Sequence, residues 1–418
     1  MKKTMLQRIL RWFSIKILEK YKPEIIGITG SIGKTSAKEA VNAVLSSKFN
    51  VRINIKNYNN EIGLPLTIIG MESGGRSKMK WLLVFFKALK LIIFKDNDYP
   101  KILILEMGSD RVGDIKYLTD LANCKIGIVT YVGTSHIEYF KTREKIAEEK
   151  SVIVSHIKNG WAVLNVDNDY VEKMQGKVTC QLITYAIDNV SANIKASNIE
   201  MQKKEDGEIS GLCFDLNYEN NVEKVVLSNI MGKHLVYAVL AASAVGIIYG
   251  LSLKEISEAL KGLKSSKGRM SLIQGIKGTF IIDDTYNASP DSVKAALLTF
   301  TKIETDKNKF VVLGDMLELG AHTEESHKNI GREMVITQAQ ALITVGERAK
   351  DVANGAREAG FANDSIFCFA KPEEAGLFLQ ERIKKGDWIL IKGSRGMKME
   401  KIVKEIMAEP QREKELLV

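Results

Sequence analysis

Cysteine and proline are both scarce in this chain of 418 residues, and each scarcity excludes a class of protein. The four cysteines (Cys124, Cys180, Cys213 and Cys368) form no CxxC pair, which excludes a zinc knuckle or a dithiol redox motif and favours a reducing cytosol. Six prolines beside 32 glycines and 45% hydrophobic residues are typical of a packed globular chain, not of a collagen-like or disordered one. The length predicts two or three domains.

Long apolar runs are also lacking, so neither a secretory signal nor a membrane-spanning helix is predicted. Charges such as Arg8 and Arg11 interrupt the first 22 residues, whose apolar side chains nevertheless recur at helical spacing and predict an amphipathic helix. A second basic and apolar segment, residues 79–95, contains Lys87 and Lys90. We expect a cytoplasmic protein in which both segments either pack on the protein or make peripheral contact with the inner face of the membrane.

An excess of positive charge is present, with 60 Lys and Arg against 51 Asp and Glu, a net charge of +9. This balance favours anionic partners such as nucleotides, acidic substrates, nucleic acid or a membrane surface. Nucleic acid is the least favoured of these, because the charge is dispersed and no motif combines aromatic with basic residues.

Apolar runs and helical stretches alternate after Pro23, which predicts an α/β fold with a mostly parallel sheet. Residues 264–268 form a polar linker, and a second alternating region follows it. We therefore predict an N-terminal helix (1–22), a central P-loop NTPase-like domain (23–267, including 79–95) and a C-terminal Rossmann-like α/β domain (268–418). The expected strands are 25–29, 102–106, 126–130, 162–165, 280–283, 310–314, 341–345 and 388–392. An antiparallel meander is expected over 178–228 with a turn at 203–207, followed by helices over 235–250 and 253–263.

The strongest local motif is the glycine-rich stretch at residues 27–36, GITGSIGKTS, between a predicted strand and a predicted helix. Backbone N–H groups of such a loop bind phosphate oxygens at a helix N-terminus, and Lys34 can reach the terminal phosphates. Thr35 or Ser36 would face Mg²⁺. Ile28 stands where the strict P-loop pattern has glycine, so the match is to the variant TGxxGK[ST][ST]. The phosphate-binding residues predicted here are Gly30, Ser31, Gly33, Lys34, Thr35 and Ser36.

Three further polar residues follow predicted strands or lie on the next helix. Glu106 ends a strand, where ligands bind in open α/β sheets, and its carboxylate suits Mg²⁺. His136 lies in a loop after the next strand, and Lys150 lies on a helix. Taken singly, each residue also fits a structural role: a solvated strand end, an ordinary histidine and a helix-surface charge.

The glycine-rich loop resembles the ATP-binding loop of the Mur ligase and folylpolyglutamate synthase family, and the order of Glu106, His136 and Lys150 resembles that of the Mur ligase central domain. This resemblance implies catalytic roles for Lys34, His136 and Lys150. It also implies Mg²⁺ ligands at Thr35, Glu106 and His136, with Lys150 joining them as a carbamate. The reaction implied is ATP-dependent amide formation through an acyl phosphate, with ATP and Mg²⁺ as cofactors.

Four further segments resemble motifs of the same family: residues 57–65, 282–292, 313–320 with His327, and 392–397. They are most similar to the branch that joins D-alanyl-D-alanine to a muramoyl-peptide precursor in peptidoglycan synthesis. By this resemblance Arg269 and Asp283 or Asp284 serve the nucleotide. The residues implied to hold the substrates are Asn59, Asn60, Glu61, Asn287, Asp315 and Arg395.

Two departures from the family pattern leave alternatives open. We expect the usual UDP-binding N-terminal domain to be absent, because the P-loop begins near residue 27. Leu235 and Ala238 stand where relatives carry Asn, so recognition of the adenine base is not predicted. The alternatives are a ligase for a different or lipid-linked acidic acceptor, and a membrane-associated nucleotide-binding protein without ligase activity.

Overall fold

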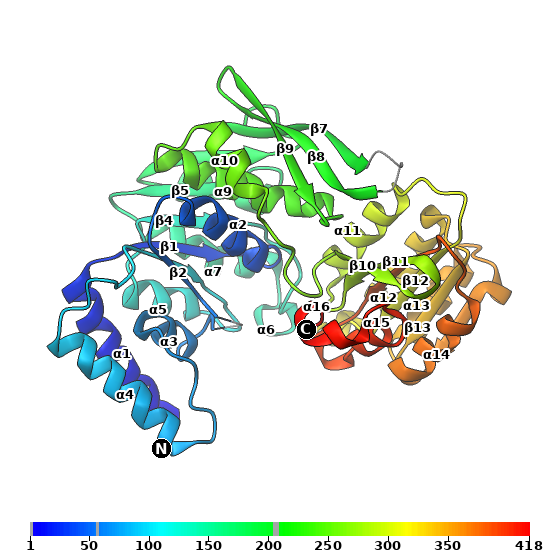
Figure 1. Cartoon of the computed structure of the whole chain (residues 1–418), viewed down its shortest axis with the longest axis horizontal. Coiled ribbons are helices and arrows are strands. Elements are labelled where there is room, and N and C mark those ends of the chain that lie inside the picture. The colour runs from blue at the N-terminus through cyan, green and yellow to red at the C-terminus, as the bar shows by residue number, and fades with distance from the viewer. Residues whose placement is uncertain (1–2, 56–57, 204–208) are drawn as a thin grey trace.

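The computed structural model describes residues 3–55, 58–203 and 209–418, and within them two β-sheets carry helices on their faces (Figure 1). The first sheet has the strand order β2-β3-β1-β4-β5-β6-β7-β8-β9 and the second β10-β11-β15-β12-β13-β14. Parallel pairing dominates both, and the α/β fold expected from the sequence is confirmed.

Six parallel strands make up the part of the first sheet that carries the site. Side chains alternate between its faces: Ile26 and Ile28 pack with helices α2 and α9, whereas Ile25 packs with helices of the opposite face. Burial on both faces explains why these strands are apolar along their whole length. The strands are β1 (Glu24–Thr29), β2 (Val51–Ile53), β3 (Ile102–Glu106), β4 (Ile126–Val129), β5 (Trp161–Asn165) and β6 (Gln181–Ala186).

Helices cover both faces of this sheet (Figure 1). One face carries α2 (Lys34–Ser46) and α9 (Lys233–Ile248), with α10 (Leu253–Leu260) beside them. The other carries α1 (Lys3–Tyr21), α3 (Gly63–Ile69), α4 (Lys78–Ile93), α5 (Asp114–Leu121), α6 (Ile137–Phe140), α7 (Arg143–Ser155) and α8 (Asp169–Glu172).

The antiparallel meander is shorter than predicted. Residues 178–228 were expected to be antiparallel throughout, but β6 pairs in parallel with β5 and with β7. The physical reason is that the second half of β6 is buried against α9, as in the preceding parallel strands. Only β7 (Ile194–Lys203), β8 (Ile209–Tyr218) and β9 (Asn221–Ser228) form the meander. The predicted turn at 203–207 falls, beyond Lys203, outside the described residues.

The second sheet begins after the polar linker with one antiparallel edge strand, β10, and continues with five parallel strands. Its strands are β10 (Ser271–Gly275), β11 (Thr279–Asp284), β12 (Lys309–Gly314), β13 (Ala341–Val345), β14 (Ile366–Phe369) and β15 (Trp388–Lys392). Its helices are α11 (Pro290–Thr301), α12 (Thr323–Arg332), α13 (Ala349–Glu358), α14 (Pro372–Arg382), α15 (Glu400–Ile406) and α16 (Glu413–Leu416).

The two basic, apolar segments both form helices, and these lie side by side at one end of the molecule (Figure 1). The ring of Phe13 stacks on Phe85 with centroids 6.0 Å apart. The ammonium of Lys20 donates to the carbonyl oxygens of Leu91 and Phe94 at the C-terminus of α4, where carbonyl groups lack partners within the helix. In the described part of the chain, every helix falls short of the length and hydropathy needed to cross a bilayer.

Removing a large side chain from the centre of the first sheet tests this packing. Ile128 on β4 is fully buried, so Ile128→Ala is expected to lower the free energy of unfolding by about 2–5 kcal/mol, through lost burial and the cavity left behind. Urea unfolding followed by circular dichroism measures the change. Val222→Ala on the exposed face of β9 is the control and should change it by less than about 0.5 kcal/mol. Equal effects of the two variants would contradict the packing described.

Candidate nucleotide and substrate site

The glycine-rich loop connects β1 to the N-terminus of α2. Gly33 has φ 85°, a left-handed conformation that favours glycine. A Cβ on Gly30 would lie 2.0 Å from the hydroxyl oxygen of Thr130, so only glycine fits there. The hydroxyl of Ser31 is buried without a hydrogen-bond partner. A loop at a helix N-terminus that holds a buried, unpaired hydroxyl is suited to a phosphate group.

Lys34 and Thr35 begin α2 and connect the loop to β3. The Lys34 ammonium donates to the carbonyl oxygen of Gly30 over 2.6 Å. Burial lowers the pKa of Lys34, and the carboxylate of Glu106 opposes that shift. The Thr35 hydroxyl donates to Oε2 of Glu106 over 3.0 Å, and the amide of Asn59 donates to Oε1 over 3.1 Å. These contacts confine the Glu106 carboxylate beside the loop.

His136 and Lys150 lie at the same edge of the sheet. The ring nitrogen Nδ1 of His136 is 3.1 Å from Oε2 of Glu318, which follows β12 of the second sheet. Burial lowers the pKa of His136, while Asp110 and Glu318 oppose that shift. The Lys150 amine is buried and donates to the hydroxyl of Ser109 over 3.2 Å.

Burial and, to a lesser extent, the positive charge of Lys34 together lower the pKa of Lys150 to about 7, although the carboxylates of Glu149 and Asp110 oppose the shift. The two lysines are therefore close enough to repel one another. A lysine with this pKa is largely neutral just above pH 7, and a neutral amine is the nucleophilic form.

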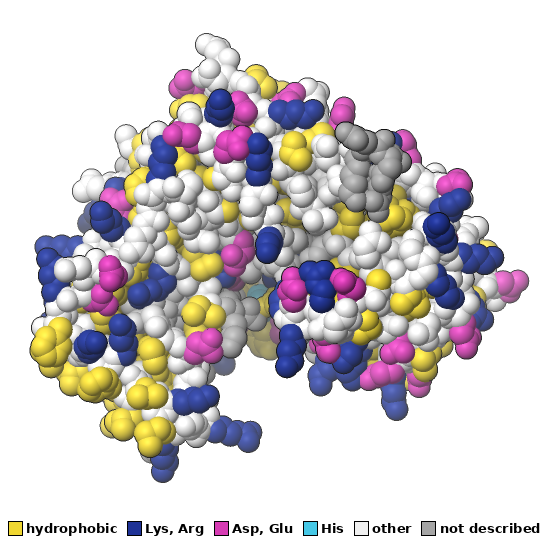
Figure 2. Space-filling model, viewed as in Figure 1, with side chains coloured by type: hydrophobic (Ala, Val, Ile, Leu, Met, Phe, Trp, Pro, Cys, Tyr) yellow, Lys and Arg dark blue, Asp and Glu magenta, His cyan; other side chains and the backbone are white. Residues whose placement is uncertain are grey.

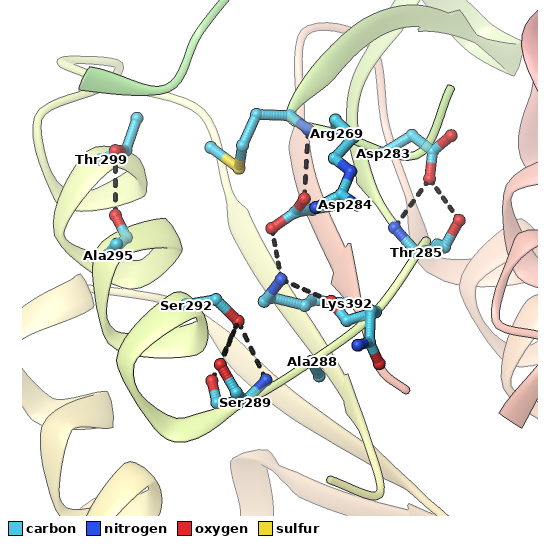
Figure 3. Close-up of polar contacts among 12 residues, drawn as sticks. Arg269, Asp283, Asp284, Thr285, Ala288, Ser289, Ser292, Ala295, Thr299 and Lys392 are labelled. Atoms are coloured by element: carbon cyan, nitrogen blue, oxygen red, sulfur yellow. Dashed lines mark hydrogen bonds and ion pairs between the residues drawn. The ribbon is translucent and has the colours of Figure 1, made fainter. Parts of the chain in front are cut away.

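The second sheet contributes a buried ion pair at the carboxyl ends of β11 and β15 (Figure 3). The Lys392 ammonium lies 2.6 Å from Oδ2 of Asp284 and also donates to the carbonyl oxygen of Asn287. Asp283 is directed to the other side of its strand, where Oδ1 accepts from the backbone and hydroxyl of Thr285. Burial raises the pKa of Asp283 to about 6.

Arg269 lies between these two groups of charges. Its guanidinium stacks over the ring of Tyr286 at 4.2 Å. Its positive charge lowers the pKa of both Lys34 and Lys392. In each case burial lowers the pKa more than Arg269 does. Cations from the two sheets thus converge on one region.

A cavity of about 210 Å³ occupies that region between the two sheets. Six residues predicted for the nucleotide or the substrate line it: Ser31, Gly33, Ser36, Arg269, Asp284 and Asn287. Lys34, Glu106, His136 and Lys150 gather beside its loop wall, as their mutual electrostatic effects show. Among the residues that the structure describes, no group of three His, Cys, Asp or Glu side chains is arranged to hold a metal ion.

Several predicted substrate residues do not line this cavity. The amide oxygen of Asn60 accepts from the backbone of Ile62 and Gly63 at the start of α3. Glu61 accepts from Gln7 of α1. Each of these side chains is thus also engaged in holding the local fold.

Two predicted substrate residues that follow strands of the second sheet also lie outside the cavity lining and contact neighbouring residues instead. Oδ1 of Asp315 accepts from the backbone N–H of Ala349 at the start of α13. Arg395 pairs with Glu400 at 3.3 Å.

Sequence reasoning missed three polar residues that line the cavity. Tyr131, Asn165 and Asp291 all line it. Asn165 ends β5 and Tyr131 closely follows β4, so their place at the carboxyl ends of parallel strands was the available signal.

Tyr237 and Ala238 also line the cavity. The hydroxyl of Tyr237 donates to Oδ2 of Asp167 over 2.9 Å, which fixes its ring at the cavity wall.

Two protein-family models match the chain. The model described as "Mur ligase middle domain" matches residues 28–79 and 87–246, and the one described as "Mur ligase, glutamate ligase domain" matches residues 268–395. The chain belongs to the Mur ligase family. Members of this family are ATP-dependent carboxylate–amine ligases, and the family resemblance seen in the sequence is confirmed.

Three individual Mur ligases show how similar this chain is to other members of the family. The UDP-N-acetylmuramoyl-tripeptide–D-alanyl-D-alanine ligase of Bacillus subtilis is 32% identical over 393 residues, covering 94% of this chain and 78% of that protein. The ligase of the same name from Mycobacterium leprae is 32% identical, covering 88% and 71%. The crystal structure of the MurF ligase from Thermotoga maritima in complex with ADP superposes with a TM-score of 0.79 at 25% identity, covering 97% and 84%.

Gly30→Ala tests the phosphate loop of this Mur ligase. The added methyl would collide with Thr130, so we expect ADP affinity to fall at least about tenfold, equivalent to about 1.4 kcal/mol. Isothermal titration calorimetry measures the affinity. Gly176→Ala is the matched control, since a Cβ there meets no atom within 4 Å. Unchanged ADP affinity in Gly30→Ala would contradict the assignment of the loop.

Proposed function

We propose that this Mur ligase joins D-alanyl-D-alanine to UDP-N-acetylmuramoyl-tripeptide, using ATP and forming an acyl phosphate. The observation that carries the proposal is the cavity between the sheets, with the glycine-rich loop on one wall and Arg269 and Lys392 on the other. The names of the relatives from Bacillus subtilis and Mycobacterium leprae support the choice of substrates.

The proposed reaction begins with ATP in the cavity. Backbone N–H groups of the loop and the Lys34 ammonium hold the phosphates, while Arg269 and Lys392 approach from the second sheet. The carboxylate of the tripeptide attacks the γ-phosphorus and ADP leaves. The free amine of D-alanyl-D-alanine then attacks the acyl carbon, phosphate leaves, and the amide remains. Enclosure between the sheets excludes water, which would otherwise hydrolyse the acyl phosphate.

Magnesium fits the oxygen donors beside the loop. Mg²⁺ prefers one or two carboxylates together with substrate phosphates and water, so a cluster of three acidic or histidine side chains is not required. Glu106 and the Thr35 hydroxyl lie together at the loop, and we assign them as Mg²⁺ ligands with His136 as a further one. Bound Mg²⁺ would offset negative charge on the transferring phosphoryl group.

Lys150 is proposed to carry a carbamate. Its lowered pKa leaves about half of the amine neutral at pH 7, and the neutral form is the one that adds to CO₂. The product is an anion, which would reverse the repulsion between Lys150 and Lys34 and add an oxygen ligand for Mg²⁺.

Substrate contacts divide between the two sheets. Asn59 is held against Glu106, so Asn59, Asn60 and Glu61 would face the tripeptide carboxylate from the loop that precedes α3. Asn287, Asp315 and Arg395 would receive the dipeptide from the second sheet. Asp283 and Asp284 would serve the nucleotide, the latter by holding Lys392.

We also propose a division of the chain into domains and a cellular location. We divide the chain into the helix 1–22, a central domain 23–267 and a C-terminal domain 268–418, with the polar linker as the hinge. The four free cysteines and the use of ATP favour the cytoplasm.

Phosphate release tests the function directly. With ATP, Mg²⁺, UDP-N-acetylmuramoyl-tripeptide and D-alanyl-D-alanine, the wild-type enzyme should release phosphate and form the pentapeptide product, identified by mass spectrometry. Lys34→Ala should lower the rate by about 100-fold or more, because the charge on the transferring phosphoryl group loses its nearest cation. Lys254→Ala, at an exposed position on α10, is the control.

The alternatives give different outcomes in that assay. Phosphate release only with another acidic or lipid-linked acceptor would retain the ligase chemistry and replace the substrate. No phosphate release with any acceptor, while ADP still binds, would indicate a nucleotide-binding protein without ligase activity and would reject the proposal.

The carbamate is tested by pH. Because the pKa of Lys150 is about 7, the neutral amine becomes more abundant as pH rises through 7, so the carbamate signal from ¹³C-bicarbonate should increase from pH 6 to pH 8. Carbon NMR measures it. Lys150→Arg should lack the signal, since a guanidinium stays protonated throughout. A signal of equal size in Lys150→Arg would contradict the assignment.

A further inference from the structure

The outer face of helices α1 and α4 carries an unusual concentration of exposed apolar side chains. Of the 19 large hydrophobic side chains exposed among the described residues, nine lie between Met5 and Trp12 or between Met79 and Phe94. Phe86 is 66% exposed and Leu82 63%. Figure 2 shows them as a yellow patch at the lower left, over the helices labelled in Figure 1. A contiguous exposed patch of this kind marks an interaction surface.

The sequence of α4 explains why these side chains are exposed. Val84, Ala88 and Leu91 recur at helical spacing and are buried against the protein. Leu82, Phe86 and Ile93 recur at the same spacing on the opposite side and face solvent. The helix is therefore apolar on two sides, and only one of them is covered by this chain.

The pair of helices is firmly supported from beneath. Stacking of Phe13 on Phe85 and the hydrogen bonds from Lys20 hold α4 against α1. Tyr21 adds hydrogen bonds from its hydroxyl to the carbonyl oxygens of Leu91 and Phe94. The apolar side chains are thus presented on a folded surface.

Charge identifies what can cover this surface. Residues 1–22 and 78–95 contain 12 of the 60 basic residues of the chain and one of its 51 acidic residues, Glu19, so they carry a net charge of +11. The rest of the chain, with 48 basic and 50 acidic residues, carries −2. The net positive charge of the protein therefore comes from these two segments.

Individual lysines on this surface are available to a ligand. Lys80 and Lys90 of α4 are exposed, and no carboxylate of the described residues lies within ion-pair distance of either. Lys87 has a partner, Asp96 at 3.6 Å.

We propose that this face, formed by the exposed side chains Trp12, Lys80, Leu82, Phe86, Lys90 and Ile93, docks the enzyme onto an anionic lipid membrane surface. Apolar side chains flanked by free lysines match the layered chemistry of such a membrane, in which phosphate headgroups lie above acyl chains. A second copy of the chain is disfavoured, because the segments that carry this face, residues 1–22 and 78–95, have a net charge of +11 and would repel those of the other copy.

This face is also joined to the predicted substrate loop. The amide of Gln7, on α1, donates to Oε1 of Glu61 over 2.8 Å. Docking through α1 and α4 would therefore bring the acceptor side of the enzyme close to the bilayer. The docking proposal itself does not depend on the ligase reaction.

Vesicle co-sedimentation of the full chain tests the proposal. We expect binding to phosphatidylcholine vesicles that contain about one third phosphatidylglycerol to exceed binding to pure phosphatidylcholine by about tenfold, and to weaken with added salt. Leu82→Glu combined with Phe86→Glu, and separately Lys80→Glu combined with Lys90→Glu, should each lower binding to the anionic vesicles by about tenfold or more.

Matched controls lie elsewhere on the surface. Leu377→Glu alters a side chain that is 54% exposed on α14, and Lys254→Glu reverses an exposed charge on α10; both should bind vesicles as the wild type does. Circular dichroism and phosphate release with soluble substrates check that all variants are folded. Vesicle binding that is absent in the wild type, or equal in the face variants and the controls, would overturn the proposal. So would a wild-type dimer in gel filtration that Leu82→Glu with Phe86→Glu converts to a monomer, without any vesicle binding.

Discussion

The arrangement of the site depends on buried positive charge at the carboxyl edge of the first sheet. Lys150 is buried and Lys34 is partly buried, and the proximity of Lys34 lowers the pKa of Lys150 in addition to the effect of burial. Glu106, bound by Thr35 and Asn59, offsets part of that charge at Lys34, and Glu149 offsets part of it at Lys150. Anions are needed to complete the balance, and triphosphate together with a carbamate on Lys150 would supply them. Glycine at position 30 lets the loop pack closely against Thr130, where a Cβ would collide with the hydroxyl oxygen.

The second sheet completes the site because a few contacts hold it against the first. Thr134 donates from its backbone N–H and its hydroxyl to Oδ2 of Asp291. Nδ1 of His136 lies 3.1 Å from Oε2 of Glu318. These contacts bring Arg269 and the Lys392–Asp284 pair opposite the phosphate loop. A ligase that must protect an acyl phosphate from water benefits from a site that only the closed arrangement completes.

Many of the strands and the phosphate loop were predictable from the sequence, for reasons that particular residues show. Strands such as 102–106 and 388–392 are short apolar runs before polar residues, and the structure confirms their bounds. The phosphate loop was recognisable because its chemistry is local in sequence. The cavity wall formed by Tyr131, Asn165 and Asp291 was not, because its members are brought together only by the sheets. The direction of β6 was missed because periodicity does not distinguish a parallel edge from the start of a meander.

Phosphoryl transfer to the acceptor carboxylate before amide formation is the central step of the proposed mechanism. Oxygen tracing tests it most directly: UDP-N-acetylmuramoyl-tripeptide labelled with ¹⁸O in its reacting carboxylate is turned over with ATP and D-alanyl-D-alanine, and the phosphate is analysed by mass spectrometry. The predicted result is one labelled oxygen in each phosphate released, because the bridging oxygen of the acyl phosphate leaves with phosphorus. Unlabelled phosphate accompanying amide formation would contradict the account.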